Sequence, residues 1–179
     1  MRTLVTIGLV AVGGLLLAAE AGAQASKVTK ENVPGITNLA RLETTIACAG
    51  AVKAEAVPEI KKMGFASIIN VREASEPGAE VEKEEAAAKA AGLKFVHVPF
   101  NVAAPAPDLV DKFLAAVTVP TNQPAFVHCA AGGRAASLWF IKRVKVDKWD
   151  QARALEEANA LGLNDRLRTW ALDYLKTHS

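Results

Sequence analysis

The segment around Cys129 constrains the fold of this chain more than any other. The apolar run Pro124–Val127 is short and typical of a strand, and the run Ala135–Ile141 is typical of a helix. The turn that joins them contains two glycines and ends at Arg134. A strand that passes through a glycine turn into a helix directs backbone N–H groups and the helix dipole into the turn. The sequence therefore predicts an anion-binding loop with a cysteine at its mouth.

The residue types in this turn suit a nucleophile that faces a tetrahedral oxyanion. The same field that binds an anion favours the thiolate form of Cys129. The planar guanidinium of Arg134 matches phosphate or sulfate oxygens, and a cation at a helix N-terminus is unfavourable unless an anion is bound there. We therefore take Cys129 and Arg134 as candidate catalytic residues. The candidate substrate-binding residues are His128, Ala130, Ala131, Gly132, Gly133 and Arg134.

The N-terminal residues have the pattern of an export signal. Arg2 is followed by an uncharged run of 16 residues, Leu4–Ala19, and then by small residues suited to cleavage. This run is shorter than the roughly 20 apolar residues of a transmembrane helix, although an uncleaved anchor is the alternative. We expect a signal peptide over residues 1–23, an N-terminal extension over 24–34 and one domain over 35–179. This organisation predicts a periplasmic or secreted protein without a stable membrane anchor after processing.

Charge and histidine content argue against two classes of function. The net charge is +2, with no basic stripe interleaved with aromatic residues, so nucleic acid is not expected as a partner. The three histidines, His97, His128 and His178, do not have the spacing of metal ligands, so we expect no metal and no cofactor. In an exported protein, Cys48 could form a disulfide with Cys129 or be a buried strand residue.

Segments typical of strands alternate with segments typical of helices. This order predicts an α/β domain with a mainly parallel central sheet flanked by helices. Asp108 follows a proline-rich loop and is expected to cap the next helix. The expected strands are Thr44–Cys48, Phe65–Val71, Lys94–Phe100 and Pro124–His128, and the expected helices are Ala54–Met63, Ala79–Ala91, Asp108–Val117, Ala135–Val144, Trp149–Ala160 and Asp165–Thr177.

The order of these elements, with the motifs INVRE, GLKFVHVPF and FVHCAAGGR, resembles cysteine-dependent protein tyrosine and dual-specificity phosphatases. Over about Gly35–Gly162, the chain is similar in particular to the bacterial phosphatase-like domain of beta-lactamase-hydrolase-like proteins. The resemblance implies a cysteine-phosphatase-like fold and two-step hydrolysis of phosphomonoesters, phosphotyrosine among them. Cys129 would attack phosphorus, Arg134 and the loop amides would hold the oxygens, and His128 would help order the loop. The implied partner is a phosphorylated small molecule or protein.

Three features depart from the pattern of these phosphatases. Arg134 lies five residues after Cys129 rather than six, where Ala135 stands, and this spacing also resembles the shorter loop of rhodanese sulfurtransferases. No hydroxyl residue follows the arginine directly. In the family, a loop before the cysteine carries an aspartate that acts as general acid, and this chain has Asn101 in that region. Asp108, 21 residues before Cys129, is a weak candidate for the acid.

These departures leave three functions open. The first is an exported cysteine phosphatase. The second is a rhodanese-like sulfurtransferase or persulfide-handling protein, because a loop with one peptide fewer makes a tighter ring that suits a persulfide sulfur. The third is a catalytically weak oxyanion-binding module that keeps the anion-binding loop without the chemistry.

Overall fold

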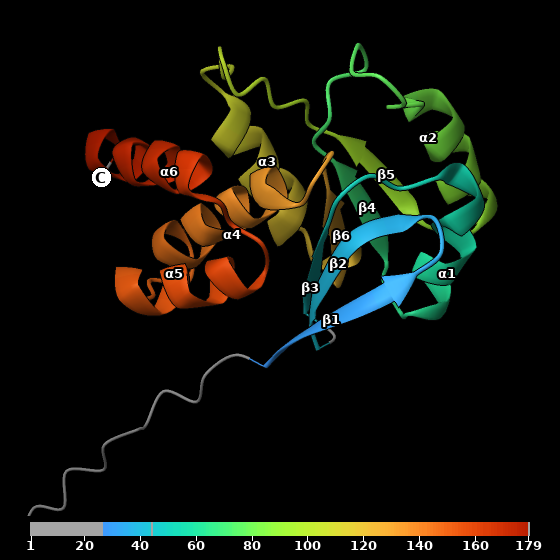
Figure 1. Ribbon diagram of the computed structural model, residues 1–179, viewed down its shortest axis with the longest axis horizontal. Coiled ribbons are helices and arrows are strands. Elements are labelled where there is room, and N and C mark those ends of the chain that lie inside the picture. The colour runs from blue at the N-terminus through green and yellow to red at the C-terminus, as the bar shows by residue number, and fades with distance from the viewer. Residues whose placement is uncertain (1–26, 44, 179) are drawn as a thin grey trace, which may run out of the picture.

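A computed structural model describes residues 27–43 and 45–178, so the predicted signal peptide lies outside the described residues. The described chain forms a six-stranded sheet in the order β1-β2-β3-β6-β4-β5 (Figure 1). The first three strands pair antiparallel, and β3, β6, β4 and β5 pair parallel. This confirms the mainly parallel α/β sheet. The strands are β1 Val28–Val33, β2 Ile36–Leu42, β3 Ile46–Ala49, β4 Ser67–Asn70, β5 Lys94–His97 and β6 Ala125–His128.

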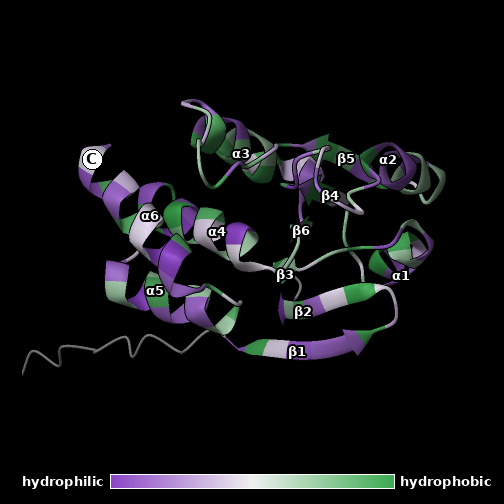
Figure 2. Cartoon of the chain, turned by 45° about the horizontal axis from the view of Figure 1, so that its top comes forward, coloured by the Kyte–Doolittle hydropathy of each residue, from purple (hydrophilic) through white to green (hydrophobic). Residues whose placement is uncertain are grey.

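The hairpin of β1 and β2 was not among the expected strands. β1 lies within residues 24–34, the segment expected to be an N-terminal extension, and it forms one edge of the sheet. Its sequence, VTKENV, is mostly polar, and Figure 2 shows the strand as largely hydrophilic. An edge strand pairs on one side only and can carry charged residues on its open side. Hydrophobic patterning therefore gives little sign of such a strand.

Helices cover both faces of the sheet (Figure 1), as strand alternation requires. In β3, Ala47 and Ala49 face the core cluster of α1 and α2, whereas Cys48 faces the larger cluster formed with α3, α4, α5 and α6. None of the helices in the described ranges has the length and hydrophobicity to span a bilayer. The helices are α1 Val57–Lys62, α2 Val81–Ala90, α3 Leu109–Thr118, α4 Gly133–Lys145, α5 Gln151–Ala160 and α6 Asp165–Thr177, with short 3-10 helices at Ala54–Ala56 and Pro120–Asn122.

The centre of the sheet positions the predicted loop. All four residues of β6 are buried between β3 and β4, and His128 is in register with Ala49 on one side and Asn70 on the other. The carboxyl ends of these three parallel strands therefore meet at one edge of the sheet. In open parallel sheets this edge is where ligands bind, and here the chain leaves β6 directly into the loop that begins at Cys129.

A buried ion-pair network joins two of the C-terminal helices. The carboxylate of Glu157 on α5, 3% exposed, accepts a hydrogen bond from the indole N–H of Trp139 at 2.7 Å and bonds from the Arg143 guanidinium at 2.7 and 3.2 Å. The guanidinium also lies 4.5 Å from the Trp139 ring centre. Removing the carboxylate would leave the buried indole N–H without an acceptor, and the half-buried Arg143 would keep only its pair with Asp147.

We predict that Glu157→Ala destabilises the protein by about 2 kcal/mol, because it leaves the buried indole N–H of Trp139 without an acceptor and removes one of the two carboxylates that pair with Arg143. Urea unfolding followed by tryptophan fluorescence measures this change. The matched control is Glu156→Ala, one residue away and exposed, which is expected to change stability by less than about 0.5 kcal/mol. Equal effects of the two variants would show that the network contributes nothing specific.

Candidate active site

The sulfur of Cys129 lies at the start of the loop, close to a backbone amide. Cys129 follows the last residue of β6, and its own N–H donates to the Ala49 carbonyl at 3.1 Å. The Gly132 N–H points to the Cys129 sulfur, with 3.0 Å between nitrogen and sulfur. Gly132 has φ of 103°, a conformation that a residue with a Cβ rarely adopts. One amide of the predicted loop, that of Gly132, therefore points to the cysteine.

Two hydrogen bonds outside the loop account for this orientation. The Ala130 carbonyl accepts from the Ala51 N–H at 3.1 Å, and the Ala131 carbonyl accepts from the Asn38 side-chain amide at 3.2 Å. In a planar trans peptide the carbonyl of one residue and the N–H of the next point in opposite directions. Holding the Ala131 carbonyl outward therefore turns the Gly132 N–H inward, towards the sulfur.

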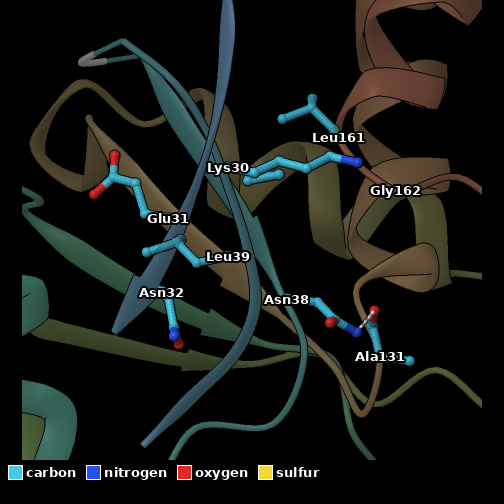
Figure 3. Close-up of a pocket in the computed structure, with 9 residues that line it drawn as sticks. Lys30, Glu31, Asn32, Asn38, Leu39, Ala131, Leu161 and Gly162 are labelled. Carbon is cyan, nitrogen blue, oxygen red and sulfur yellow. Dashed lines mark hydrogen bonds between the residues drawn. The ribbon is translucent and has the colours of Figure 1, made fainter. Parts of the chain in front are cut away.

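Asn38 comes from the N-terminal hairpin and reaches the loop beside a separate hollow. Figure 3 shows its side chain pointing to Ala131, with Lys30 extending across the hollow towards Leu161 and Gly162. Asn38 has φ of 48°, which asparagine tolerates better than most residues. The hairpin that sequence analysis missed thus supplies one of the two anchors of the loop.

Arg134, in the first turn of α4, is buried and fixed by three hydrogen bonds. Its two terminal nitrogens donate to the two carboxylate oxygens of Glu76 at 2.6 and 2.8 Å, and one of them also donates to the Phe100 carbonyl at 2.8 Å. A guanidinium has five N–H groups, so Nε–H and one Nη2–H remain for a ligand. Those two form one edge of the guanidinium and can bind two oxygens of one anion.

The charges around Arg134 keep both members of this pair ionised. Partial burial acts to raise the pKa of Glu76, but hydrogen bonds from Arg134 and from the backbone of Glu73 outweigh it and lower that pKa to about 2. Burial acts to lower the pKa of Arg134, and the Glu76 carboxylate, together with the charge of Cys129 as a thiolate, raises it instead. The guanidinium is therefore a permanent cation beside the sulfur.

Sequence analysis did not identify Glu76. It lies in the loop after β4, which Arg72 holds by donating to Glu76 at 3.3 Å, to the Pro77 carbonyl at 2.7 Å and to the Gly78 carbonyl at 2.9 Å. The strand order could have revealed Glu76. Because β4 neighbours β6 in the parallel sheet, a carboxylate just after β4 lies at the same edge as the loop after β6.

The hollow at the sulfur is walled by the loop that begins at Cys129 and by the start of α6. The two walls pack closely at Gly133, where a Cβ would lie 2.8 Å from the Asn164 side-chain nitrogen and 2.9 Å from a methyl group of Leu167, so that those side chains would have to shift. Asn164 in turn caps α6 by accepting from the Leu167 N–H at 3.0 Å. The residues that line the hollow are Val102, Cys129, Ala130, Ala131, Gly133, Arg134, Asn164, Asp165, Arg166 and Leu167.

The structure corrects the prediction that His128 binds substrate. Its side chain is 1% exposed and lies 2.7 Å from Glu84 of α2, whose other carboxylate oxygen accepts from Asn70 at 2.8 Å. Consecutive residues of a strand face opposite sides of the sheet, and His128 does not line the hollow at Cys129. A histidine in this position supports the base of the loop from behind but does not contact a bound anion.

Asp108 also differs from expectation. It precedes α3, but its side chain makes no capping hydrogen bond and instead lies 2.8 Å from the ammonium group of Lys112. That contact lowers the pKa of Asp108. The side chain is exposed and does not line the hollow, so neither the cap nor the weak assignment as a catalytic acid is supported. Asn101 organises the proline-rich loop by accepting from the Ala103 and Ala104 N–H groups.

Both cysteines are free thiols in the structure, and Cys48 is the buried strand residue of the two alternatives. Complete burial, together with the nearby charges of Cys129 and Glu157, raises the pKa of Cys48. Cys48 is therefore an unreactive neighbour of Cys129. Within the described residues no cluster of histidine, cysteine or acidic side chains is arranged to hold a metal ion.

The chain was compared with known families, curated proteins and solved structures. The model of the family "Beta-lactamase hydrolase-like protein, phosphatase-like domain" matches residues 38–146, more than half of the 179 residues. No curated protein matches the chain. Solved structures do match the chain, among them the following three.

The first is a putative phosphatase (DUF442) from Shewanella putrefaciens, with a TM-score of 0.65 and 19% identity, covering 83% of this chain and 99% of the other. A variant of TpbA from P. aeruginosa in complex with pTyr has a TM-score of 0.61 and 18% identity, covering 82% and 86%. The catalytic core of the PP-IP phosphatase SIW14 from S. cerevisiae has a TM-score of 0.60 and 20% identity, covering 78% and 87%. At these identities the structures establish the shared fold. The family match, which covers more than half of the chain, shows that the chain belongs to the phosphatase-like domain family of beta-lactamase hydrolase-like proteins.

Proposed function

We propose that this protein is an exported phosphatase that hydrolyses phosphomonoesters through a phosphocysteine intermediate. The observation that carries the proposal is the Gly132 N–H directed at the Cys129 sulfur, beside a fixed guanidinium with two free N–H groups. This arrangement places a nucleophile and donors for oxyanions in one hollow, as phosphoryl transfer requires. The proposed export follows from the signal-peptide pattern of residues 1–23.

The mechanism begins with a phosphate dianion in the hollow. Two of its oxygens bind Nε–H and Nη2–H of Arg134, and the loop amides donate to the equatorial oxygens. The Cys129 thiolate attacks phosphorus in line, the S–P bond forms and the bond from phosphorus to the leaving oxygen breaks. Water then attacks phosphorus, the S–P bond breaks and inorganic phosphate leaves. Donors aimed at charge that develops in the transition state are the main source of catalysis here.

Aryl phosphates are the substrates we consider first. TpbA, which shares the fold, has been solved with pTyr bound. We extend this substrate class to the present chain, with phosphotyrosine in a small molecule or protein as the proposed partner. Arg166 adds an exposed cation at the rim of the hollow, which favours approach of a dianionic ester.

The two other functions left open by the sequence predict different products at the same cysteine. A sulfurtransferase would carry an additional sulfur on Cys129 after treatment with thiosulfate. A binding module would hold phosphate without hydrolysing an ester. We favour hydrolysis because the family match is to a phosphatase-like domain and the guanidinium retains donors for two oxygens of a bound anion.

We predict that the protein hydrolyses p-nitrophenyl phosphate and that Cys129→Ser lowers kcat at least about 1,000-fold, because a hydroxyl is a far weaker nucleophile than a thiolate. Release of nitrophenol measures the rate. The matched control is Cys48→Ala, which removes the other cysteine, buried in the neighbouring strand, and is expected to retain activity.

A gain of about 32 Da on Cys129 after thiosulfate treatment, without ester hydrolysis, would instead identify the persulfide chemistry. Phosphate binding that Arg134→Ala abolishes, with no turnover by the intact protein, would identify the binding module.

We also predict that Glu76→Gln weakens both stability and turnover. A neutral amide offers one acceptor oxygen, so Arg134 loses one of its two bonds to this side chain and its orientation. Because Glu76 is partly exposed, solvent screening limits the loss of stability at pH 7 to about 1 kcal/mol.

The dependence on pH separates this effect from a general loss of packing. The pKa of Glu76 is lowered from 4.5 to about 2, so its contribution is complete above pH 4.5 and is lost as the pH falls towards 2. Urea unfolding at pH 7, 5 and 3 should therefore show a difference between wild type and Glu76→Gln that shrinks at pH 3. The control, Glu80→Gln, removes an exposed pair with Lys83. A difference that stays constant with pH would contradict the role of the charge.

A further inference from the structure

We propose that Asp165, the first residue of α6, is the general acid that protonates the leaving oxygen. The proposal rests on the proposed function, and it supplies the group for which sequence analysis found only a weak candidate. In the cysteine phosphatases that this chain resembles, an aspartate on a loop before the cysteine is the general acid. The corresponding loop of this chain, residues 101–107, contains no carboxylate. The acid must therefore come from another element.

The position of Asp165 is the first reason. Among the described residues that line the hollow with Cys129, Asp165 is the one carboxylate. The side chains of Asn164 and Leu167 pack directly against Gly133, which brings the start of α6 against the loop that begins at Cys129. The Asn164 cap then fixes where the first turn of the helix begins. Asp165 therefore lines the same hollow as Cys129, and its side chain is open to solvent.

The other carboxylates near the loop are committed elsewhere. Glu76 accepts two hydrogen bonds from Arg134, and with a pKa of about 2 it has no proton to donate. Glu73 accepts from Asn101 at 3.2 Å and does not line the hollow. Asp108 lies against Lys112 and is also outside it.

The Asp165 side chain, in contrast to these carboxylates, is not held by a buried partner. Its side chain is 92% exposed and makes an ion pair with Arg168 at 3.0 Å across one turn of the helix. Exposed pairs of this kind contribute little and exchange readily with solvent. The carboxyl group is therefore not fixed by the surrounding structure and can turn to the leaving oxygen of an ester bound in the hollow.

The proposed proton transfer balances over the two steps. As the Cys129 thiolate forms the S–P bond, the protonated carboxyl group of Asp165 gives its proton to the leaving oxygen, and an alcohol or phenol departs. In the second step the Asp165 carboxylate takes a proton from the attacking water. Phosphate leaves, the thiolate is restored and the acid is ready again.

The experiment compares two esters that differ in their need for an acid. 2,4-Dinitrophenyl phosphate releases a stable phenolate without protonation, whereas phenyl phosphate releases a basic phenolate that requires it. We expect Asp165→Asn to lower kcat/KM for phenyl phosphate about 100-fold, the usual contribution of general acid catalysis, and to change the rate with the dinitrophenyl ester less than threefold. The matched control is Asp173→Asn on the same helix, because Asp173 is also exposed and pairs at 3.0 Å with Lys176 three residues on.

The outcomes separate this proposal from the proposed function. An equal loss with both esters, or a selective loss in Asp108→Asn instead, overturns the role of Asp165. Wild type that hydrolyses the dinitrophenyl ester through Cys129 but not phenyl phosphate overturns the role of Asp165 and leaves the phosphatase intact. Wild type that hydrolyses neither ester overturns both.

Discussion

The site depends on two carbonyl groups that are held away from it. The Ala130 and Ala131 carbonyls accept hydrogen bonds from Ala51 and Asn38 on the outer side of the loop. Because each carbonyl is fixed to the N–H of the next residue through a planar peptide, these bonds determine which polarity faces the sulfur. If the same peptides were rotated, carbonyl oxygens would face Cys129 and would repel both the thiolate and a bound anion. The sheet edge thus orders the anion-binding loop before any ligand arrives.

The second requirement is a cation that cannot rotate. Three of the five N–H groups of Arg134 donate hydrogen bonds to Glu76 and Phe100, which leaves one edge of the guanidinium for a ligand. The loop that carries Glu76 is itself held by Arg72. Because the protein itself holds this donor in place, no free energy of reorganisation is needed when the reaction occurs. The loops after β4 and β6 therefore form one electrostatic unit.

The sequence was sufficient for the central part of the fold and for the loop that begins at Cys129. The apolar run before Cys129, the glycines after it and Arg134 predict a strand, a turn and a helix because local conformation decides them. β1 was missed because the polar residues of an edge strand carry no hydrophobic period. β2 was missed because its buried Ile36, Leu39 and Leu42 recur every third residue, whereas a strand pattern alternates every second residue. The functions of Glu76 and Asp165 depend on which elements meet in space, and no local pattern contains that information. His128 was misplaced for a simpler reason, since strand alternation turns its side chain to the opposite face from that of Cys129.

The central claim is that the Gly132 amide and the fixed guanidinium of Arg134 place donors for an anion beside the Cys129 sulfur. The most direct measurement is the rate at which Cys129 is alkylated by anionic iodoacetate and by neutral iodoacetamide, followed by peptide mass, with buried Cys48 as the internal reference. The account predicts that iodoacetate reacts faster at Cys129, that added inorganic phosphate protects this cysteine, and that Arg134→Ala removes both effects. Faster reaction with iodoacetamide, together with no protection by phosphate, would contradict it.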